Sequence, residues 1–234
     1  MRQAIVLGGG RSRRMGRDKM GVLLEGRSLL RRTVDAALGW AECVVVVAPE
    51  PDGWEPDPRV RFTLEDPPFG GPVAGIAAAT AILLAAGQVN EVLLLAGDLA
   101  APEAVVGRLA EVEPGTDGVV LRDEDGWPQY LAGRYRFDAL VSAIDALDGT
   151  RDLSVRRALR RLDVAQVDAP SAVTKDLDTP EDLASLTDRR PNTTVVTTAL
   201  DHKPSDTVTL SSRLGRGRPR TSKSVGGAHL EERG

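Results

Sequence analysis

The sequence predicts an α/β protein built on a single doubly wound, mostly parallel sheet. Three short runs are apolar throughout, at residues 4–7, 43–48 and 92–96, which is typical of strands covered on both faces. Segments with a helical spacing of apolar residues separate them, and such alternation favours parallel strands with helices on both sides. The chain has 234 residues, 41% of them hydrophobic, so it is long enough to bury a substantial core.

The other elements follow from local patterns along the chain. Ser28 can cap a first helix, whose apolar spacing continues to Leu38 and which Gly39 closes. Apolar and polar residues alternate over 60–64, which indicates a half-exposed strand. Similar patterns predict helices over 72–86, 102–112, 137–147 and 154–162, and strands over 118–121, 129–133 and 164–167.

Charge and composition divide the chain into two parts. From Arg189 onward, nine Lys and Arg residues outnumber four Asp and Glu residues, whereas the preceding part carries 21 basic and 30 acidic side chains. The final segment has too few large apolar residues to offset the entropy lost on ordering. We therefore predict a folded domain over residues 1–189 and a basic, low-complexity, disordered tail over 190–234.

The composition excludes several classes of function. The net charge of -4 argues against a general nucleic-acid binder, and the single cysteine, Cys43, excludes an intrachain disulfide and a Cys-rich zinc site. Both histidines, His202 and His229, lie beyond the predicted domain, which therefore cannot contain a Ser-His-Asp triad or a His-based zinc site. The apolar runs are too short to span a membrane, and no signal-peptide pattern is present, so we expect a cytoplasmic protein.

The clearest functional signal is the segment LGGGRSRRMGRDK at residues 7–19, directly after the first strand. Consecutive glycines let backbone amides approach a ligand closely. Five cationic side chains follow within nine residues: Arg11, Arg13, Arg14, Arg17 and Lys19. This combination is the chemistry of a polyphosphate cradle. The spacing fits neither the dinucleotide fingerprint nor the P-loop, because Arg13 stands where the last glycine of the fingerprint belongs and Gly16 is not followed by Lys-Ser/Thr.

Two acidic residues are expected at the same edge of the sheet, where ligands of open α/β sheets bind. Asp98 follows the strand at 92–96 and is a natural ligand for Mg²⁺ beside a polyphosphate, although it could instead cap the next helix. Asp66 belongs to a Pro/Gly-rich loop before the helix at 72–86. Its carboxylate could accept hydrogen bonds from a sugar or a base, and a plain turn is the alternative.

A third acidic segment precedes the predicted tail. Asp176 and Asp178 lie on the same side of an extended stretch, so one of them could complete a metal site. The residues that follow, 179–182, have the capping Thr, first-turn Pro and acidic side chains of a helix start. The two acidic residues could therefore serve either the metal or the helix entry.

Together, and in this order, the four motifs resemble the MobA-like nucleotidyltransferases, in particular the molybdenum cofactor guanylyltransferases. The resemblance covers about residues 2–189, and residues 7–19 are similar to the family signature L-A-G-G-x-S-x-R-M-G-x-D-K. It implies a Rossmann-like nucleotidyltransferase fold and a nucleotide site formed by Leu7, Gly8, Gly9, Gly10, Lys19, Asp66, Gly71, Pro72, Gly75 and Asp98. We expect Arg14, Lys19 and Asp98 to be catalytic, and Asp98 and Asp178 to bind Mg²⁺.

The resemblance further implies transfer of GMP from GTP to the phosphate of molybdopterin, with release of pyrophosphate. The attacking phosphate is already an anion, so positioning and cationic stabilisation carry the catalysis and no general base is required. The LGGG and PVAG segments, at 7–10 and 72–75, favour guanine over cytosine by this resemblance. Molybdoenzymes or their chaperones are further expected partners, whereas membrane and nucleic acid are not.

Other readings of the sequence stay open. The chain could be a CTP-dependent molybdopterin cytidylyltransferase, a phospholactate guanylyltransferase or a sugar-phosphate nucleotidyltransferase. A non-catalytic nucleotide-binding protein would keep the same fold without turnover. The basic GRGRPR run at 215–220 resembles a minor-groove clamp and could tether the protein to DNA, but short basic stretches are also common in solvated tails.

Overall fold

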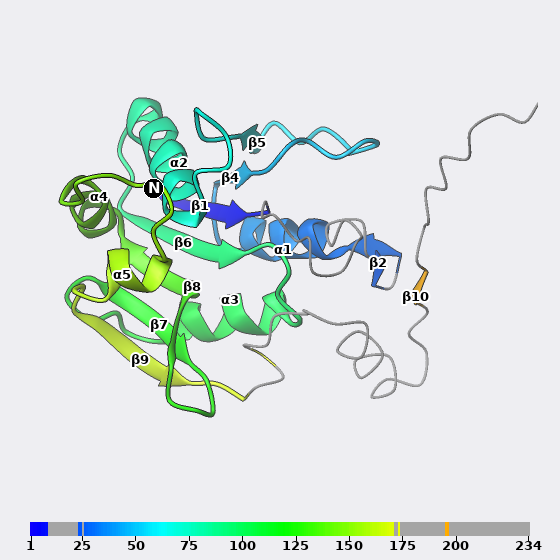
Figure 1. Cartoon of the computed structure of the whole chain (residues 1–234). Helices are drawn as coiled ribbons and strands as arrows, with labels where there is room; N and C mark the ends of the chain where they lie inside the picture. The colour runs from blue at the N-terminus through cyan, green and yellow to red at the C-terminus, as the bar shows by residue number, and fades with distance from the viewer. Residues whose placement is uncertain (9–22, 25, 171–172, 174–194, 197–234) are drawn as a thin grey trace, which may run out of the picture. The chain divides into compact units, whose positions relative to one another are not determined.

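The computed structural model describes residues 1–8, 23–24, 26–170, 173 and 195–196 (Figure 1). The strands of its main sheet are β1 (Arg2–Leu7), β4 (Cys43–Val47), β5 (Val60–Thr63), β6 (Glu91–Ala96), β7 (Gly118–Arg122), β8 (Pro128–Arg136) and β9 (Val164–Asp168). The helices are α1 (Leu29–Leu38), α2 (Pro72–Ala86), α3 (Pro102–Glu111), α4 (Phe137–Asp145) and α5 (Val155–Leu159). Every helix and strand predicted within the described residues is present.

The seven strands follow the order β5-β4-β1-β6-β8-β7-β9. All neighbouring pairs are parallel except those of β8, which runs antiparallel to both β6 and β7. The predicted doubly wound, mostly parallel α/β fold is therefore confirmed. The carboxyl ends of β5, β4, β1, β6 and β7 meet at one edge of the sheet, and β8 begins at that same edge because it runs in the opposite direction.

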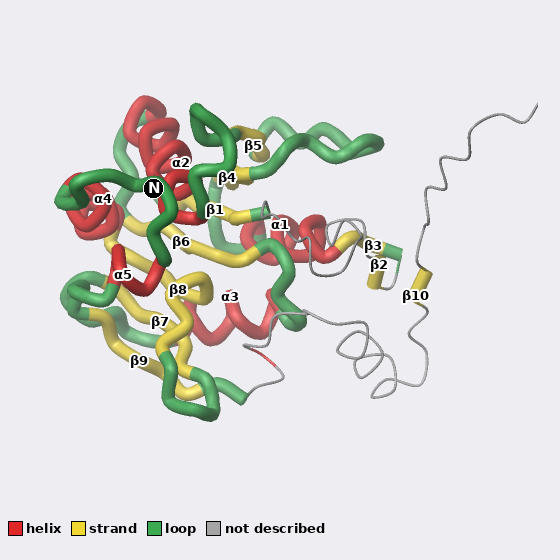
Figure 2. The backbone as a smooth tube through the Cα atoms, in the orientation of Figure 1, coloured by secondary structure: helices red, strands yellow, loops and turns green. Residues whose placement is uncertain are grey.

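Helices cover both faces of the sheet, as Figure 2 shows in red around the yellow strands. Alternate residues of β1 serve the two faces: Ala4 and Val6 belong to the core under α1 and α3, whereas Ile5 and Leu7 belong to the core under α2, α4 and α5. All four are buried. Because successive side chains of a strand point to opposite faces, a strand covered on both sides is apolar throughout.

Helix α1 begins where the sequence predicts, since the Ser28 hydroxyl accepts a hydrogen bond from the Arg31 backbone N–H at 3.1 Å. Gly39 closes the helix but keeps a helical φ of -68°, so it does not supply the left-handed conformation for which glycine is usually selected there. The capping role predicted for Ser28 and the helix end predicted at Gly39 are both confirmed.

Strand β8 is longer than the predicted 129–133 because charged residues interrupt its apolar pattern. Arg134 is buried, although arginine side chains are mostly exposed in proteins and the sequence therefore predicts an exposed position. Its guanidinium pairs with Glu91 at 3.0 Å and donates to the Val112 carbonyl, and these partners allow the charge to be buried.

Three two-residue strands form a separate antiparallel sheet in the order β10-β2-β3. They are β2 (Leu23–Leu24), β3 (Arg27–Ser28) and β10 (Val195–Val196). Two residues are too few for a periodic pattern, so the sequence does not predict β2 and β3. It leaves open whether Val195–Thr198 forms a strand, and the structure has one at Val195–Val196. The helix predicted from residue 179 and the domain boundary at 189 lie outside the described residues. Within the described part of the chain, no helix is long and apolar enough to cross a membrane.

Candidate functional site

The predicted site begins where β1, β4 and β6 end side by side. The Gly8 backbone N–H donates to the Val47 carbonyl at 3.2 Å, and the Gly97 N–H donates to the Leu7 carbonyl at 2.9 Å. These bonds continue the sheet one residue past its last strand pairs. The structure thus places Leu7 and Gly8, from the start of the glycine-rich segment, against the residue that precedes Asp98.

The chain is tightly packed at both of these positions, and backbone atoms crowd Gly97 in particular. A Cβ atom on Gly97 would lie 3.0 Å from the Gly8 Cα and 3.0 Å from the Leu7 carbonyl oxygen. A Cβ on Gly8 would lie 2.8 Å from the Leu30 Cδ1 of α1. A side chain at Gly97 would therefore push the two strand ends apart. The sequence places both glycines at strand ends, but the contact between them joins residues more than 80 positions apart, which no local pattern reveals.

Asp98 lies in the turn directly after β6 and is partly buried. Among the described residues, no three His, Cys, Asp or Glu side chains come close enough together to enclose a metal ion. Mg²⁺ does not require such a cage, because it is often held by one or two carboxylates together with water and substrate phosphates. A single hard carboxylate at this edge therefore fits a metal whose other ligands come from a triphosphate.

The loop that carries Asp66 follows β5 at the same edge. Asp66 is exposed, and the loop turns back through a hydrogen bond from the Gly70 N–H to the Glu65 carboxylate at 3.0 Å. Gly71 has a φ of 88°, a conformation that glycine adopts at little cost, and it leads directly into Pro72 at the first turn of α2. The amino-terminal end of α2, which is favourable for anions, is thereby placed at the ligand edge.

Gly75, in the first turns of α2, is buried against the sheet. A Cβ atom there would lie 2.9 Å from the Val47 Cγ1. The absence of a side chain lets the start of α2 lie directly against β4. Gly75 was predicted to belong to the nucleotide site. The contacts that the structure describes for it are between helix α2 and the strands of the sheet.

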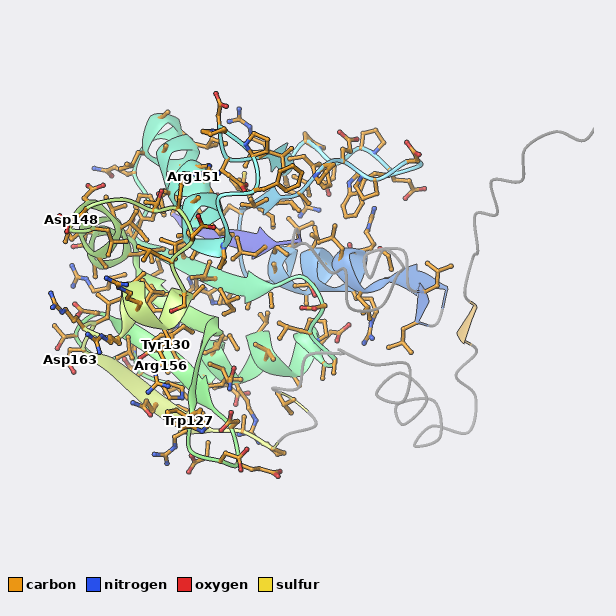
Figure 3. All side chains as sticks on the ribbon, viewed as in Figure 1. Trp127, Tyr130, Asp148, Arg151, Arg156 and Asp163 are labelled. Atoms are coloured by element: carbon orange, nitrogen blue, oxygen red, sulfur yellow. The ribbon has the colours of Figure 1, made fainter. Side chains whose placement is uncertain are left out.

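A segment of the chain that the sequence did not single out supports the Asp66 loop. The Arg151 guanidinium donates to the Pro67 carbonyl at 2.6 Å, and the Asp152 N–H donates to the Gly70 carbonyl at 2.8 Å (Figure 3 labels Arg151). Arg151 lies 84 residues from Pro67 in the sequence, so no local pattern could reveal the contact. These bonds connect the loop after β5 to the segment that leads into α5.

Strand β8 has an irregularity at this edge. Its register with β7 shifts so that Val120 pairs with Gly133 and Leu121 pairs with Gln129, which leaves residues 130–132 as a bulge. The buried Tyr135 hydroxyl donates to the Tyr130 carbonyl at 2.8 Å and fixes the bulge, and burial raises the pKa of Tyr135 well above its ordinary value. Bulges next to sites redirect side chains, and this one lies beside the end of β6.

A pocket of about 1160 Å³ lies elsewhere, between α4 and α5. Its lining includes Asp117, just before β7, and Arg136, the last residue of β8. Asp117 and Arg136 lie at the edge of the sheet opposite the carboxyl ends of the parallel strands. The glycines and the carboxylate predicted to bind the nucleotide lie at the carboxyl edge, so we assign the candidate site to that edge.

The described residues include only part of the predicted site. Leu7, Gly8, Asp66, Gly71, Pro72, Gly75 and Asp98 are described, whereas Gly9, Gly10, Arg14, Lys19, Asp176 and Asp178 lie outside the described residues. The described members come from the loops after β1, β5 and β6 and from the start of α2. They therefore share one edge of the sheet, as the topology predicts.

Comparison with known proteins identifies the family. Residues 4–169 match the family model described as the MobA-like NTP transferase domain. The chain is 35% identical over 144 residues to a probable molybdenum cofactor guanylyltransferase of Synechococcus elongatus, covering 57% of this chain and 71% of that protein. It is 33% identical over 196 residues to the molybdenum cofactor guanylyltransferase of Rhizobium johnstonii, covering 76% and 88%. The predicted resemblance is confirmed.

Solved structures show the same fold at lower sequence identity. Molybdopterin-guanine dinucleotide biosynthesis protein A from Archaeoglobus fulgidus is 19% identical with a TM-score of 0.56, covering 80% of this chain and 97% of that one. The protein Rv0371c from Mycobacterium tuberculosis is 21% identical with a TM-score of 0.59 and the same coverage.

Proposed function

We propose that this chain, which belongs to the MobA-like NTP transferase family, transfers GMP from GTP to the phosphate of molybdopterin and releases pyrophosphate. The observation that carries the proposal is the junction of Gly8 with Gly97, which sets the first glycine of the glycine-rich segment against the residue before Asp98 at the ligand edge of the sheet. The similarity to molybdenum cofactor guanylyltransferases supports GTP as the donor and molybdopterin as the acceptor.

The proposed reaction suits the residues at this edge. An oxygen of the acceptor phosphate forms a bond to the α-phosphorus of GTP while the bond from that phosphorus to the pyrophosphate oxygen breaks. The attacking oxygen is already anionic, so the site needs charge neutralisation and alignment rather than a base. Asp98 would hold Mg²⁺, with Asp178 as the second ligand, and the bound ion would neutralise phosphate charge.

The remaining residues divide between the two parts of GTP. The backbone at Leu7–Gly10 would lie against the phosphates, and Arg14 and Lys19 would neutralise charge on the leaving pyrophosphate. Asp66, with the turn at Gly71–Gly75, would contact the nucleoside. Molybdoenzymes or their chaperones as later partners, a cytoplasmic location and a disordered tail over 190–234 stay predictions.

A nucleotide panel tests the proposal directly. The purified chain is incubated with molybdopterin, Mg²⁺ and GTP, CTP or UTP in turn, and dinucleotide product and pyrophosphate are both measured. We expect the guanine dinucleotide to form with GTP, in amounts that match the pyrophosphate. A preference for CTP would identify a cytidylyltransferase, and binding of GTP without any product would identify a nucleotide-binding protein without turnover.

A further inference from the structure

One exposed aromatic side chain at the ligand edge is not explained by the core. Trp40 and Trp54 are partly buried and pack against the core, whereas Trp127 is 51% exposed. It belongs to the hairpin between β7 and β8. An exposed tryptophan offers a large, flat apolar surface to water, and at a ligand edge this surface is available to a planar ligand.

The hairpin holds Trp127 in a fixed position. The Asp123 carboxylate accepts hydrogen bonds from the Trp127 backbone N–H at 2.8 Å and from the Gln129 side-chain amide at 2.5 Å. The Asp123 N–H donates to the Trp127 carbonyl at 3.0 Å. These bonds hold the backbone of the turn at the point from which the indole projects.

A cation from another element lies over the indole. The Arg156 guanidinium carbon is 4.4 Å from the ring centroid, within the range of a cation–π interaction (Figure 3). Arg156 is exposed and belongs to α5, which follows the segment bonded to the Asp66 loop. The pair thus combines a flat aromatic surface with a positive charge, a combination that suits a flat ligand carrying negative charge.

The position of the pair relative to Asp98 indicates which ligand it serves. In the sheet order, β6 and its following Asp98 lie between the Asp66 loop after β5 and the hairpin that joins β7 to β8. In-line phosphoryl transfer requires the attacking and leaving oxygens on opposite sides of the phosphorus. The attacking oxygen of the acceptor therefore lies opposite the leaving pyrophosphate. With the nucleoside proposed on the β5 side of Asp98, the β8 side of the same edge, where Trp127 and Arg156 lie, is left for the rest of the acceptor.

We infer that Trp127 and Arg156 form a binding surface for the acceptor, which we call the acceptor platform. The planar pterin ring of the acceptor stacks on this surface, and the positive charge of Arg156 matches the negative charge of the acceptor. This inference rests on the proposed function and adds the residues that recognise the acceptor. The platform positions the acceptor phosphate but takes no part in bond making, so its loss affects acceptor binding and leaves GTP binding intact.

Steady-state kinetics of single variants test the platform. We expect Trp127→Ala to raise the KM for molybdopterin by about tenfold or more, in the range for loss of an aromatic partner of a stacked base. Trp127→Phe keeps a stacking surface and stays within about threefold of the wild type, and Arg156→Leu raises KM by about two- to fivefold. The Kd for GTP, measured by calorimetry, stays unchanged in all three.

Leu84→Ala serves as the matched control, because Leu84 is also a large exposed apolar side chain but lies near the far end of α2. It should change neither constant. An unaltered acceptor KM in Trp127→Ala would overturn the inference, as would a parallel loss of GTP affinity. If Trp127→Ala lowers Tm, Trp127→Leu keeps the bulk of the side chain without the aromatic ring and is expected to show the same rise in KM.

A binding experiment separates this inference from the proposed reaction. The fluorescence of the wild type and of Trp127→Phe is titrated with a pterin monophosphate. Quenching in the wild type that is absent in Trp127→Phe supports the platform even if no GMP is transferred, in which case only the reaction is wrong. Equal quenching in both proteins, or none in either, would overturn the platform even if GMP transfer is observed.

Discussion

The two halves of the ligand edge are held together in different ways. On the side of β4, β1 and β6, backbone packs directly on backbone, and an added Cβ at Gly97 would come within 3.0 Å of main-chain atoms. On the side of β8, side chains make the connections, such as Tyr135 to Tyr130 and Arg156 over Trp127. The first half should therefore be sensitive to any added atom, whereas the second should be sensitive to the loss of a partner.

The largest expected effect comes from the carboxylate between the two halves. Asp98→Ala should reduce GMP transfer by about 10²- to 10³-fold or more, because a charged group that stabilises the transition state is lost. The Tm should stay close to that of the wild type. The rate is measured at saturating Mg²⁺ with the unfolding curve as the control, and turnover above a tenth of the wild type would remove Asp98 from the mechanism.

The next effect tests the packed half. Gly97→Ala should lower the free energy of unfolding by about 1–3 kcal/mol, the usual cost of overpacking. Urea denaturation measures the change, and Gly107→Ala is the matched control. Gly107 lies in α3, and a Cβ atom added there would meet no atom within 4 Å, so alanine should be neutral or stabilise by up to about 1 kcal/mol. Equal stabilities for the two variants would contradict the packing argument.

These two halves also differ in how well the sequence predicts them. Apolar runs and glycines are local signals, so the strands at the packed half were predicted directly, and Leu7, Gly8 and Asp98 lie at their ends as expected. The half at β8 depends on contacts between separate elements, such as Arg156 of α5 over Trp127 of the hairpin. The same is true elsewhere of Arg151 with Pro67 in the loop after β5, and of the buried Arg134 with Glu91, 43 residues away. Such pairings leave no periodic pattern, which is why the extension of β8 and the support of the Asp66 loop were missed.

A smaller effect tests the half built from side chains. Tyr135→Phe removes the hydrogen bond to the Tyr130 carbonyl and should lower the free energy of unfolding by about 1 kcal/mol. The same bond fixes the bulge in β8, so the acceptor KM should rise while the Kd for GTP stays constant. Urea denaturation and steady-state kinetics on the same samples check both. A rise in the GTP Kd instead would show that the two halves are not independent.

The smallest effect is a dependence on alkaline pH. Burial raises the pKa of Tyr135 well above 10, so above that pH the unfolded chain loses the phenol proton while the folded protein keeps it. The stability that Tyr135 contributes is complete below pH 10 and is lost as pH rises, by at most about 1.4 kcal/mol per unit. The difference in unfolding free energy between the wild type and Tyr135→Phe should therefore shrink between pH 10 and 11. A constant difference would mean that the phenol ionises alike in both states.

The reversed direction of β8 has a consequence for how this family can diversify. A parallel strand reaches the ligand edge only at its end, and the chain must then cross back to the opposite edge before the next parallel strand can begin. β8 instead enters the sheet from that edge, directly after a tight turn of five residues, 123–127. The turn can lengthen, shorten or exchange its side chains while every covering helix stays in place, so the acceptor recognition proposed for this turn can evolve separately from the edge proposed to bind GTP.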